Sequence, residues 1–81
     1  MNDAVGAELQ KRLKELGEQL RRTRRELGVS RAKLAEKIEM HPMNYARIEQ
    51  GKQNVTFDTL FRIAEGLGVD LVVRLAQRQE R

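Results

Sequence analysis

The chain has 81 residues, which suits one small domain whose modest core would gain stability from oligomerisation. Charged residues make up 35% of it and the net charge is +4, a balance that fits a polyanionic partner or simply a well-solvated surface. The absence of cysteine excludes disulfides and thiolate metal sites. The longest strongly apolar run, Leu71-Val72-Val73, is far shorter than the about 20 residues that cross a bilayer, so we expect a cytoplasmic protein without membrane contact.

Residues 4–27 predict a long amphipathic helix. Apolar side chains recur there at spacings of mostly three and four, namely Val5, Leu9, Leu13, Leu16, Leu20 and Leu27. This stripe fits packing into a core or a coiled-coil seam of about three heptads. Gly17 is a candidate break in the helix, because a glycine inside a helix costs about 1 kcal/mol relative to alanine. The basic run at residues 21–25 spreads around the helix, so we interpret most of it as solvated surface.

Residues 30–52 predict two short helices joined by a tight bend. The first runs from Arg31 to about Ile38 behind Ser30, whose side chain can cap its first turn. The second begins at Pro42, because the N–H that proline lacks would have no partner at the first helical position, and it ends before Gly51. The expected core positions of the two helices are Leu34, Ala35, Ile38, Tyr45 and Ile48. The outward positions of the second helix are Met43, Asn44, Ala46, Arg47 and Gln50.

The last third of the chain predicts another helix and then a change of pattern. Thr56 can cap a helix that ends near Gly68, and its buried stripe consists of Leu60, Ile63, Ala64 and Leu67, with Phe57 and Phe61 beside it. From Val69 onward apolar residues alternate, which favours a strand, although Asp70 could instead cap a fifth helix. A strand cannot be stable alone, and its simplest partner is its own copy across a two-fold axis.

The chain resembles the phage-repressor and Cro type of helix-turn-helix, also called the xenobiotic-response-element family. The resemblance is carried, in order, by LGEQLRRTRREL, LAEKI, YARIEQGK and TFDTLFRIAEGLGV. The later VDLVVRL also resembles the dimerising strand of some antitoxins of this family. The implied fold is all-α, a compact bundle of four to five helices with a central helix-turn-helix and a candidate C-terminal strand that pairs across a dimer. The implied parts are a helical extension (1–15), a DNA-binding domain (16–68) and a dimerisation strand or helix with a polar tail (69–81).

The resemblance also implies which residues contact DNA. Pro42, Met43 and Arg47 match positions from which family members touch base edges, with Asn44 adjacent. Pro42 and Met43 offer no hydrogen bonds to bases, so Asn44 and Arg47 carry direct readout, since arginine suits guanine and asparagine suits adenine. For Arg47 the alternative is a pair with a nearby acid of its own surface. The predicted phosphate-binding residues are Arg31, His41, Gln50, Lys52 and Asn54. For Arg31, Gln50 and Lys52 the alternative is a solvated side chain, and for His41 it is a helix cap.

Two further features concern the scaffold. Arg24 and Glu49 match a pair that in the family forms a structural ion pair between the first and third helices. Glu39 stands in the bend where the family usually has glycine, and a left-handed conformation there would be strained for a residue with a Cβ. Ser30 has no base arranged to activate it, and the single histidine lacks metal-binding partners, so we expect neither an enzyme nor a cofactor.

Together these features lead to one main interpretation and one alternative. The main interpretation is a sequence-specific transcriptional regulator, most simply a repressor, that binds an inverted repeat in double-stranded DNA as a homodimer. An all-helical form suits a restriction-modification controller or phage-type repressor. The alternative is an antitoxin-type module that neutralises a protein partner such as a toxin while regulating its own operon. The partner would then bind the N-terminal extension or the tail from Leu71.

Overall fold

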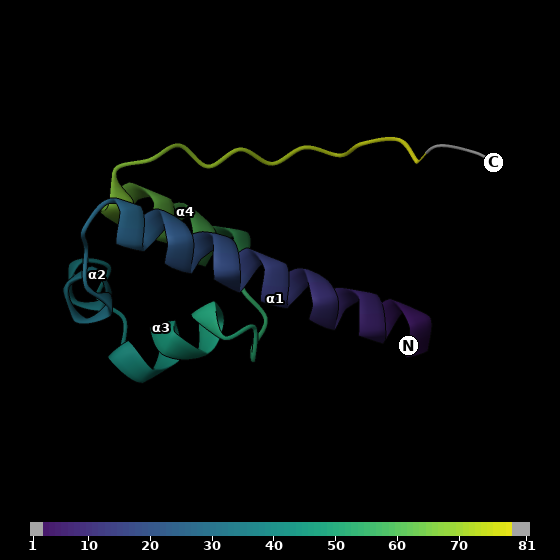
Figure 1. Cartoon of the computed structure of the whole chain (residues 1–81), viewed down its shortest axis with the longest axis horizontal. Helices are drawn as coiled ribbons and strands as arrows, with labels where there is room; N and C mark the ends of the chain where they lie inside the picture. The colour runs from purple at the N-terminus through teal and green to yellow at the C-terminus, as the bar shows by residue number, and fades with distance from the viewer. Residues whose placement is uncertain (1–2, 79–81) are drawn as a thin grey trace.

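The computed structural model describes residues 3–78 as four α-helices followed by an extended segment (Figure 1). The helices are α1 (Asp3–Glu26), α2 (Arg31–Lys37), α3 (Pro42–Glu49) and α4 (Phe57–Leu67). α3 contacts both α1 and α2, and α2 also contacts α4. The N-terminal half of α1 and the extended segment after α4 both reach past the other helices on the same side (Figure 1), and the longest dimension is 44 Å. The all-α fold with a central helix-turn-helix is thus confirmed, with four helices.

The helices begin and end at the capping residues that the sequence indicates. The Ser30 hydroxyl accepts a hydrogen bond from the Lys33 backbone N–H at 3.1 Å, and the Thr56 hydroxyl accepts one from the Thr59 backbone N–H at 3.1 Å. Each bond satisfies an N–H that has no partner inside its own helix. α4 ends at Gly68, whose φ of 74° is left-handed. Local sequence therefore sets the length of the short helices.

The core lies where α2, α3 and α4 meet. Its buried members are Leu34, Ala35, Ile38, Tyr45, Ile48, Ile63 and Leu67, and partly buried apolar side chains pack around them. Tyr45, Leu34, Ile48 and Ile63 are the largest side chains that are fully buried. Burying a large apolar side chain contributes about 1.5–3 kcal/mol, so these side chains hold α2 and α3 at a fixed angle.

The bend between α2 and α3 contains a left-handed residue at the position where the family usually has glycine. Glu39 has a φ of 56°, and it is the only residue other than glycine with a positive φ in the described chain. Its backbone N–H bonds to the Glu36 carbonyl at 3.1 Å, and the next N–H, of Met40, bonds to the Ala35 carbonyl at 2.8 Å. These two bonds close the C-terminal end of α2 and turn the chain toward α3.

α1 is continuous, so the break considered at Gly17 does not form. Gly17 instead permits a close crossing of two helices. A Cβ at this position would lie 2.7 Å from the backbone oxygen of Ile48 and even closer to that of Glu49. Only glycine lets α1 approach the end of α3 at this distance, and that tertiary contact offsets its low helix propensity.

The apolar stripe of α1 divides into two parts. Leu13 is buried and Leu20 packs against the core. Val5 and Leu9 lie farther toward the N-terminus and are 55% and 39% exposed. The stripe therefore packs into the fold only between Leu13 and Leu20, because Leu27 at its C-terminal end is again 48% exposed. The two phenylalanines of α4, Phe57 and Phe61, are also more than half exposed.

Residues 69–78 form neither a helix nor a strand, so no fifth helix is present in the described chain. The segment leaves the end of α4 and runs opposite to the chain direction of α1, toward the end of the molecule where α1 begins (Figure 1). Val69 packs against the core, whereas Val72, Val73 and Leu75 are 76%, 63% and 99% exposed. A strand needs a neighbouring strand for its hydrogen bonds, so pairing across a dimer stays a prediction. Residues 79–81 of the predicted tail lie outside the described residues.

None of the described helices combines the length and the apolar character that a membrane span requires.

Replacing Gly17 with alanine should lower the free energy of unfolding by roughly 1–3 kcal/mol, because the new Cβ would meet backbone atoms that cannot rotate away. Urea denaturation followed by circular dichroism measures the change. Gly6 is the matched control, because it lies in the same helix and a Cβ there would have no atom within 4 Å. Gly6→Ala should stabilise by up to about 1 kcal/mol. Equal stability of the two variants would contradict the close crossing of α1 and α3.

Candidate nucleic-acid interface

The outward face of α3 carries the predicted base-contacting residues. Pro42, Met43, Asn44 and Arg47 are all exposed, and Met43 exposes 68% of its surface. Arg47 follows Met43 by four residues and Gln50 follows Arg47 by three. This spacing places the three side chains in a row along one side of α3. The structure therefore brings the apolar N-terminal turn of α3 and its polar C-terminal turn onto one solvent-facing surface.

Arg47 has a partner that the sequence did not indicate. Its Nε donates a hydrogen bond to Oε1 of Gln53, in the loop after α3, at 3.1 Å. The predicted alternative, an acidic partner, is not found among residues 3–78. The Nη atoms make no hydrogen bond or ion pair to the described chain. They remain as two parallel donors, the arrangement that binds O6 and N7 of guanine.

His41 caps α3. Its Nδ1 accepts a hydrogen bond from the Met43 backbone N–H at 3.1 Å. An accepting Nδ1 carries no proton, so the neutral ring holds its proton on Nε2, which can donate outward. The cap and a phosphate contact, posed as alternatives for His41, are therefore chemically compatible.

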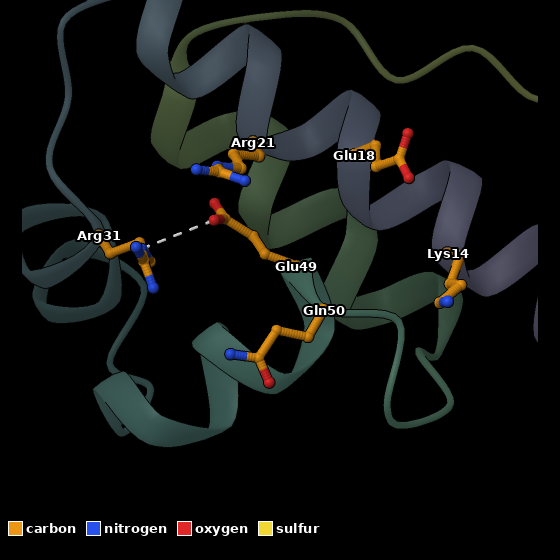
Figure 2. A pocket seen from close by; sticks show the side chains of 6 residues that line it. All are labelled: Lys14, Glu18, Arg21, Arg31, Glu49 and Gln50. Carbon is orange, nitrogen blue, oxygen red and sulfur yellow. Dashed lines mark ion pairs between the residues drawn. The ribbon is translucent and has the colours of Figure 1, made fainter.

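The other predicted phosphate-binding residues lie at both ends of the helix-turn-helix. Arg31 stands in the first turn of α2, and Gln50, Lys52 and Asn54 follow α3; all four are exposed. The backbone N–H groups of Gln50 and Lys52 already donate to the carbonyls of Ala46 and Arg47, at 3.1 and 2.9 Å. Only the side chains of these two residues are free for an anion. Figure 2 shows Arg31 and Gln50 on the rim of a hollow beside α1.

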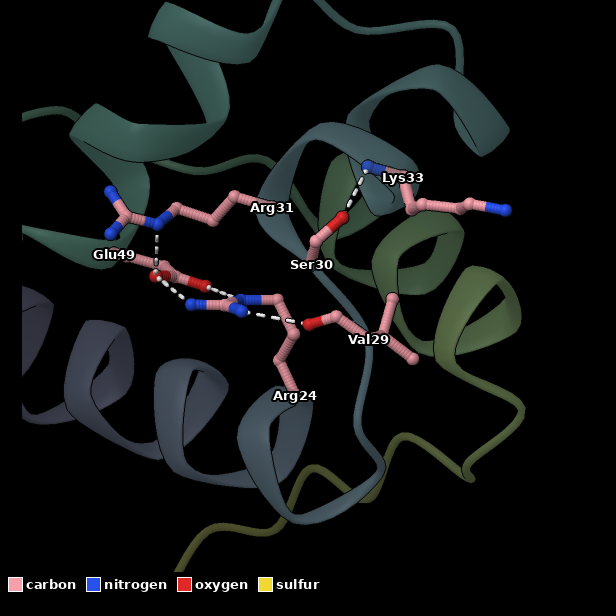
Figure 3. Close-up of polar contacts among 6 residues, drawn as sticks. All are labelled: Arg24, Val29, Ser30, Arg31, Lys33 and Glu49. Atoms are coloured by element: carbon pink, nitrogen blue, oxygen red, sulfur yellow. Dashed lines mark hydrogen bonds and ion pairs between the residues drawn. The ribbon is translucent and has the colours of Figure 1, made fainter.

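A buried ion pair positions this surface (Figure 3). Arg24 of α1 donates to Glu49 of α3 through Nε at 2.7 Å and through Nη2 at 3.2 Å, and its Nη1 donates to the Val29 carbonyl at 2.8 Å. Both side chains are almost fully buried. The predicted ion pair is thus confirmed as a bidentate contact that joins α1, α3 and the loop between α1 and α2.

The charges around Glu49 favour its ionised form. Burial raises the pKa of this carboxyl, but Arg24, then Tyr45 and Arg31, lower it by more, so the net pKa falls below 4.5. The Arg31 guanidinium lies 3.7 Å from Glu49 and remains half exposed. Burial and the nearby Glu49 raise the pKa of the Tyr45 hydroxyl. The Tyr45 hydroxyl makes no hydrogen bond of standard geometry in the described chain. It therefore lowers the pKa of Glu49 because it lies close to the carboxylate, without a formed hydrogen bond.

The described residues contain no group of three or more His, Cys, Asp or Glu side chains that could hold a metal ion.

The comparisons with known proteins agree with this geometry. Two short helices joined by a tight bend, with the second exposed along one face, define a helix-turn-helix of the Cro type, a class of DNA-binding transcriptional regulators. A family model described as a helix-turn-helix domain matches residues 15–77, and the chain belongs to that family. The crystal structure of the restriction-modification controller protein C.AhdI from Aeromonas hydrophila matches with a TM-score of 0.72 and 25% identity, over 74% of this chain and 91% of that chain. No curated protein matches the sequence significantly.

Glu49→Gln should lower the free energy of unfolding by about 3 kcal/mol at neutral pH, because it leaves Arg24 buried without a counter-charge. The pKa of Glu49 is lower in the folded state than in the unfolded state. Its stabilising contribution is therefore fully present above the unfolded pKa and is lost as pH falls through the folded pKa. The variant should accordingly show a weaker loss of stability in acid than the wild type.

Urea denaturation over a series of pH values measures both effects. Glu65→Gln is the control, since Glu65 is exposed and makes no ion pair in the described chain; its variant should stay within about 0.5 kcal/mol of the wild type. An acid dependence that Glu49→Gln leaves unchanged would show that this carboxylate does not control it.

Proposed function

We propose that the protein is a repressor that binds an inverted-repeat operator as a homodimer. The observation that carries the proposal is the outward face of α3, where Asn44 and Arg47 are exposed between candidate phosphate-binding groups at both ends. Each α3 of the dimer would enter one major groove. The two half-sites would then lie about 34 Å apart, which is one turn of the DNA helix, or a multiple of that distance apart. The likeness to a restriction-modification controller supports a regulator of this kind.

Base contacts divide between two kinds of side chain. Arg47 would bind guanine through its two Nη atoms while Nε stays with Gln53, and Asn44 would pair with adenine. Pro42 and Met43 would make apolar contacts in the groove, for which thymine methyl groups are the natural partners. Few hydrogen bonds reach the bases in this arrangement, so DNA shape would supply part of the specificity.

Phosphate contacts would fix the register of α3 on the duplex. Arg31 would bind a phosphate on one side of the major groove. The side chains of Gln50, Lys52 and Asn54 would bind phosphates on the other side. The outward Nε2 of His41 would add a contact near the start of α3. Such contacts carry little sequence information and make binding sensitive to salt.

The experiment that tests this function is the selection of duplexes bound by the purified protein from random DNA. We expect an enriched inverted repeat. The centres of its two half-sites should be about 10 base pairs apart, which is one turn of DNA, or a whole number of turns apart. Enrichment of a single half-site would contradict the dimeric mode. Absence of any enriched sequence would contradict specific recognition altogether.

Arg47→Ala should weaken binding to the selected operator by about 1–3 kcal/mol and remove discrimination at one base-pair position of each half-site. Titration of the operator and its single-base variants measures this loss. Arg62→Ala is the control, because it removes the same charge from α4, where Arg62 pairs with Asp58 at 3.2 Å. A folded Arg47→Ala variant with unchanged preference at every position would show that Arg47 does not contact a base.

The exposed apolar tail supports the dimer. If residues 69–76 paired as a strand with the same segment of a second copy, Val73 and Leu75 would share one face and would contact apolar side chains of that copy. Leu75→Asp should therefore raise the dimer dissociation constant at least tenfold, about 1.4 kcal/mol, in sedimentation equilibrium. Gln77→Asp adds the same charge two residues later and should have a much smaller effect. Equal dissociation constants for the wild type and Leu75→Asp would exclude the tail as the dimer interface.

A second candidate function is an antitoxin-type module. Two exposed apolar sites favour it, the tail and the Val5–Leu9 side of the projecting end of α1. In this case a second polypeptide would copurify in a one-to-one ratio, and Leu75→Asp or Leu9→Asp would release it. Operator binding by the protein alone with no such polypeptide would favour the repressor.

A further inference from the structure

An open hollow of about 310 Å³ lies between α1, α2 and α3 (Figure 2). Its lining residues are Lys14, Glu18, Arg21, Arg31, Glu49 and Gln50. Arg31 and Gln50 already belong to the proposed phosphate-binding set. The other two cations, Lys14 and Arg21, come from α1, a helix to which the proposed function gives no contact with DNA.

The packing of α1 on α3 places these two side chains. A Cβ on Gly51, just after α3, would lie 2.7 Å from the Cα of Lys14, so the α1 backbone touches the turn that leads to Lys52. The Gly17 crossing, one helical turn farther along, holds the next part of α1 against Glu49. Lys14 and Arg21 are seven positions apart, so they share one face of α1 and stand about 10.5 Å apart along its axis.

The charges of the hollow leave these cations without partners. Glu49 is matched by Arg24 at 2.7 Å and by Arg31 at 3.7 Å. The side chains of Lys14, Arg21 and Glu18 make no ion pair or hydrogen bond within the described chain. Arg12, on the same helix, shows the contrast, because it pairs with Glu8 at 2.9 Å and with Glu15 at 3.2 Å. Two unpaired cations beside Arg31 and Gln50 produce a positive potential that extends that surface along α1.

We propose that Lys14 and Arg21 bind backbone phosphates of duplex DNA, which makes α1 a further phosphate-binding element. This inference rests on the proposed function and adds a contact surface to it. The ligand is the phosphodiester group, recognised through its charge by an ammonium and a guanidinium group. Glu18 lies between the two cations in sequence and lines the same hollow, so its carboxylate repels a phosphate that binds there.

The test measures duplex binding over a series of salt concentrations, on the selected operator and on an unrelated sequence. Lys14→Gln and Arg21→Gln should each reduce the magnitude of the log–log salt slope by about 0.9, and the double variant by about twice that. Both sequences should lose affinity by similar factors, because phosphate contacts carry no base information. Glu18→Gln should change affinity in the opposite direction and tighten binding to both sequences.

Arg12→Gln is the matched control, since it removes one positive charge from the same helix at a site that is already paired. It should leave the salt slope unchanged. An equal loss of slope in Arg12→Gln would show a general effect of net charge and would overturn the assignment. An unchanged slope in the double variant, with its fold verified by circular dichroism, would overturn it as well.

The salt series separates a phosphate-binding role of α1 from DNA binding by the protein as a whole. Wild-type protein that binds duplex DNA with a slope insensitive to Lys14 and Arg21 leaves the repressor intact and excludes α1 as a phosphate-binding element. Wild-type protein that binds no duplex DNA overturns both. A loss confined to the operator would assign the two residues to sequence preference and overturn the phosphate role.

Discussion

The bidentate ion pair between Arg24 and Glu49 is the contact on which the presentation of α3 depends. It joins the last turn of α1 to the last residue of α3, and the third donor of Arg24 holds the carbonyl of Val29 just before α2 begins. One guanidinium group thus fixes three segments. Replacing a buried pair with apolar residues is often neutral in free energy, so its value here is geometric. It sets the direction in which the exposed face of α3 points.

Close backbone contact complements this pair along α1. The absence of a side chain at Gly17 brings α1 onto the carbonyl groups at the end of α3, and Gly51 lets the following turn approach Lys14. A small core of α2, α3 and α4 could not by itself orient a 24-residue helix. The ion pair and the two glycines therefore fix α1 against α3, and this is what allows cations of α1 to lie beside Arg31 and Gln50.

Sequence alone predicted those features that depend on neighbouring residues in the chain. Caps at Ser30 and Thr56 and the helical spacing of apolar residues located the short helices within a residue or two, and family resemblance supplied the Arg24–Glu49 pair. The low helix propensity of glycine indicates a candidate break at Gly17, but propensity contains no information about α3, whose contact keeps α1 continuous. Gln53 was missed because its contact with Arg47 depends on the path of a loop without periodicity. The basic run at residues 21–25 is largely solvated as predicted, since Arg21, Arg22 and Arg25 are exposed, and Arg24, which is buried, is the exception that the family resemblance identified.

The left-handed Glu39 has a consequence for how stability and recognition are linked. Glycine would adopt this backbone freely, whereas a residue with a Cβ adopts it at a cost of about 1–2 kcal/mol. The angle between α2 and α3 is therefore imposed by the packing of Ile38, Tyr45 and their neighbours, against the local preference of the turn. A bend held in this way relaxes when the packing loosens. Substitutions deep in the core, far from any nucleotide, would thus change the fit of α3 to the groove before the domain unfolds, so thermal softening and loss of specificity should occur together.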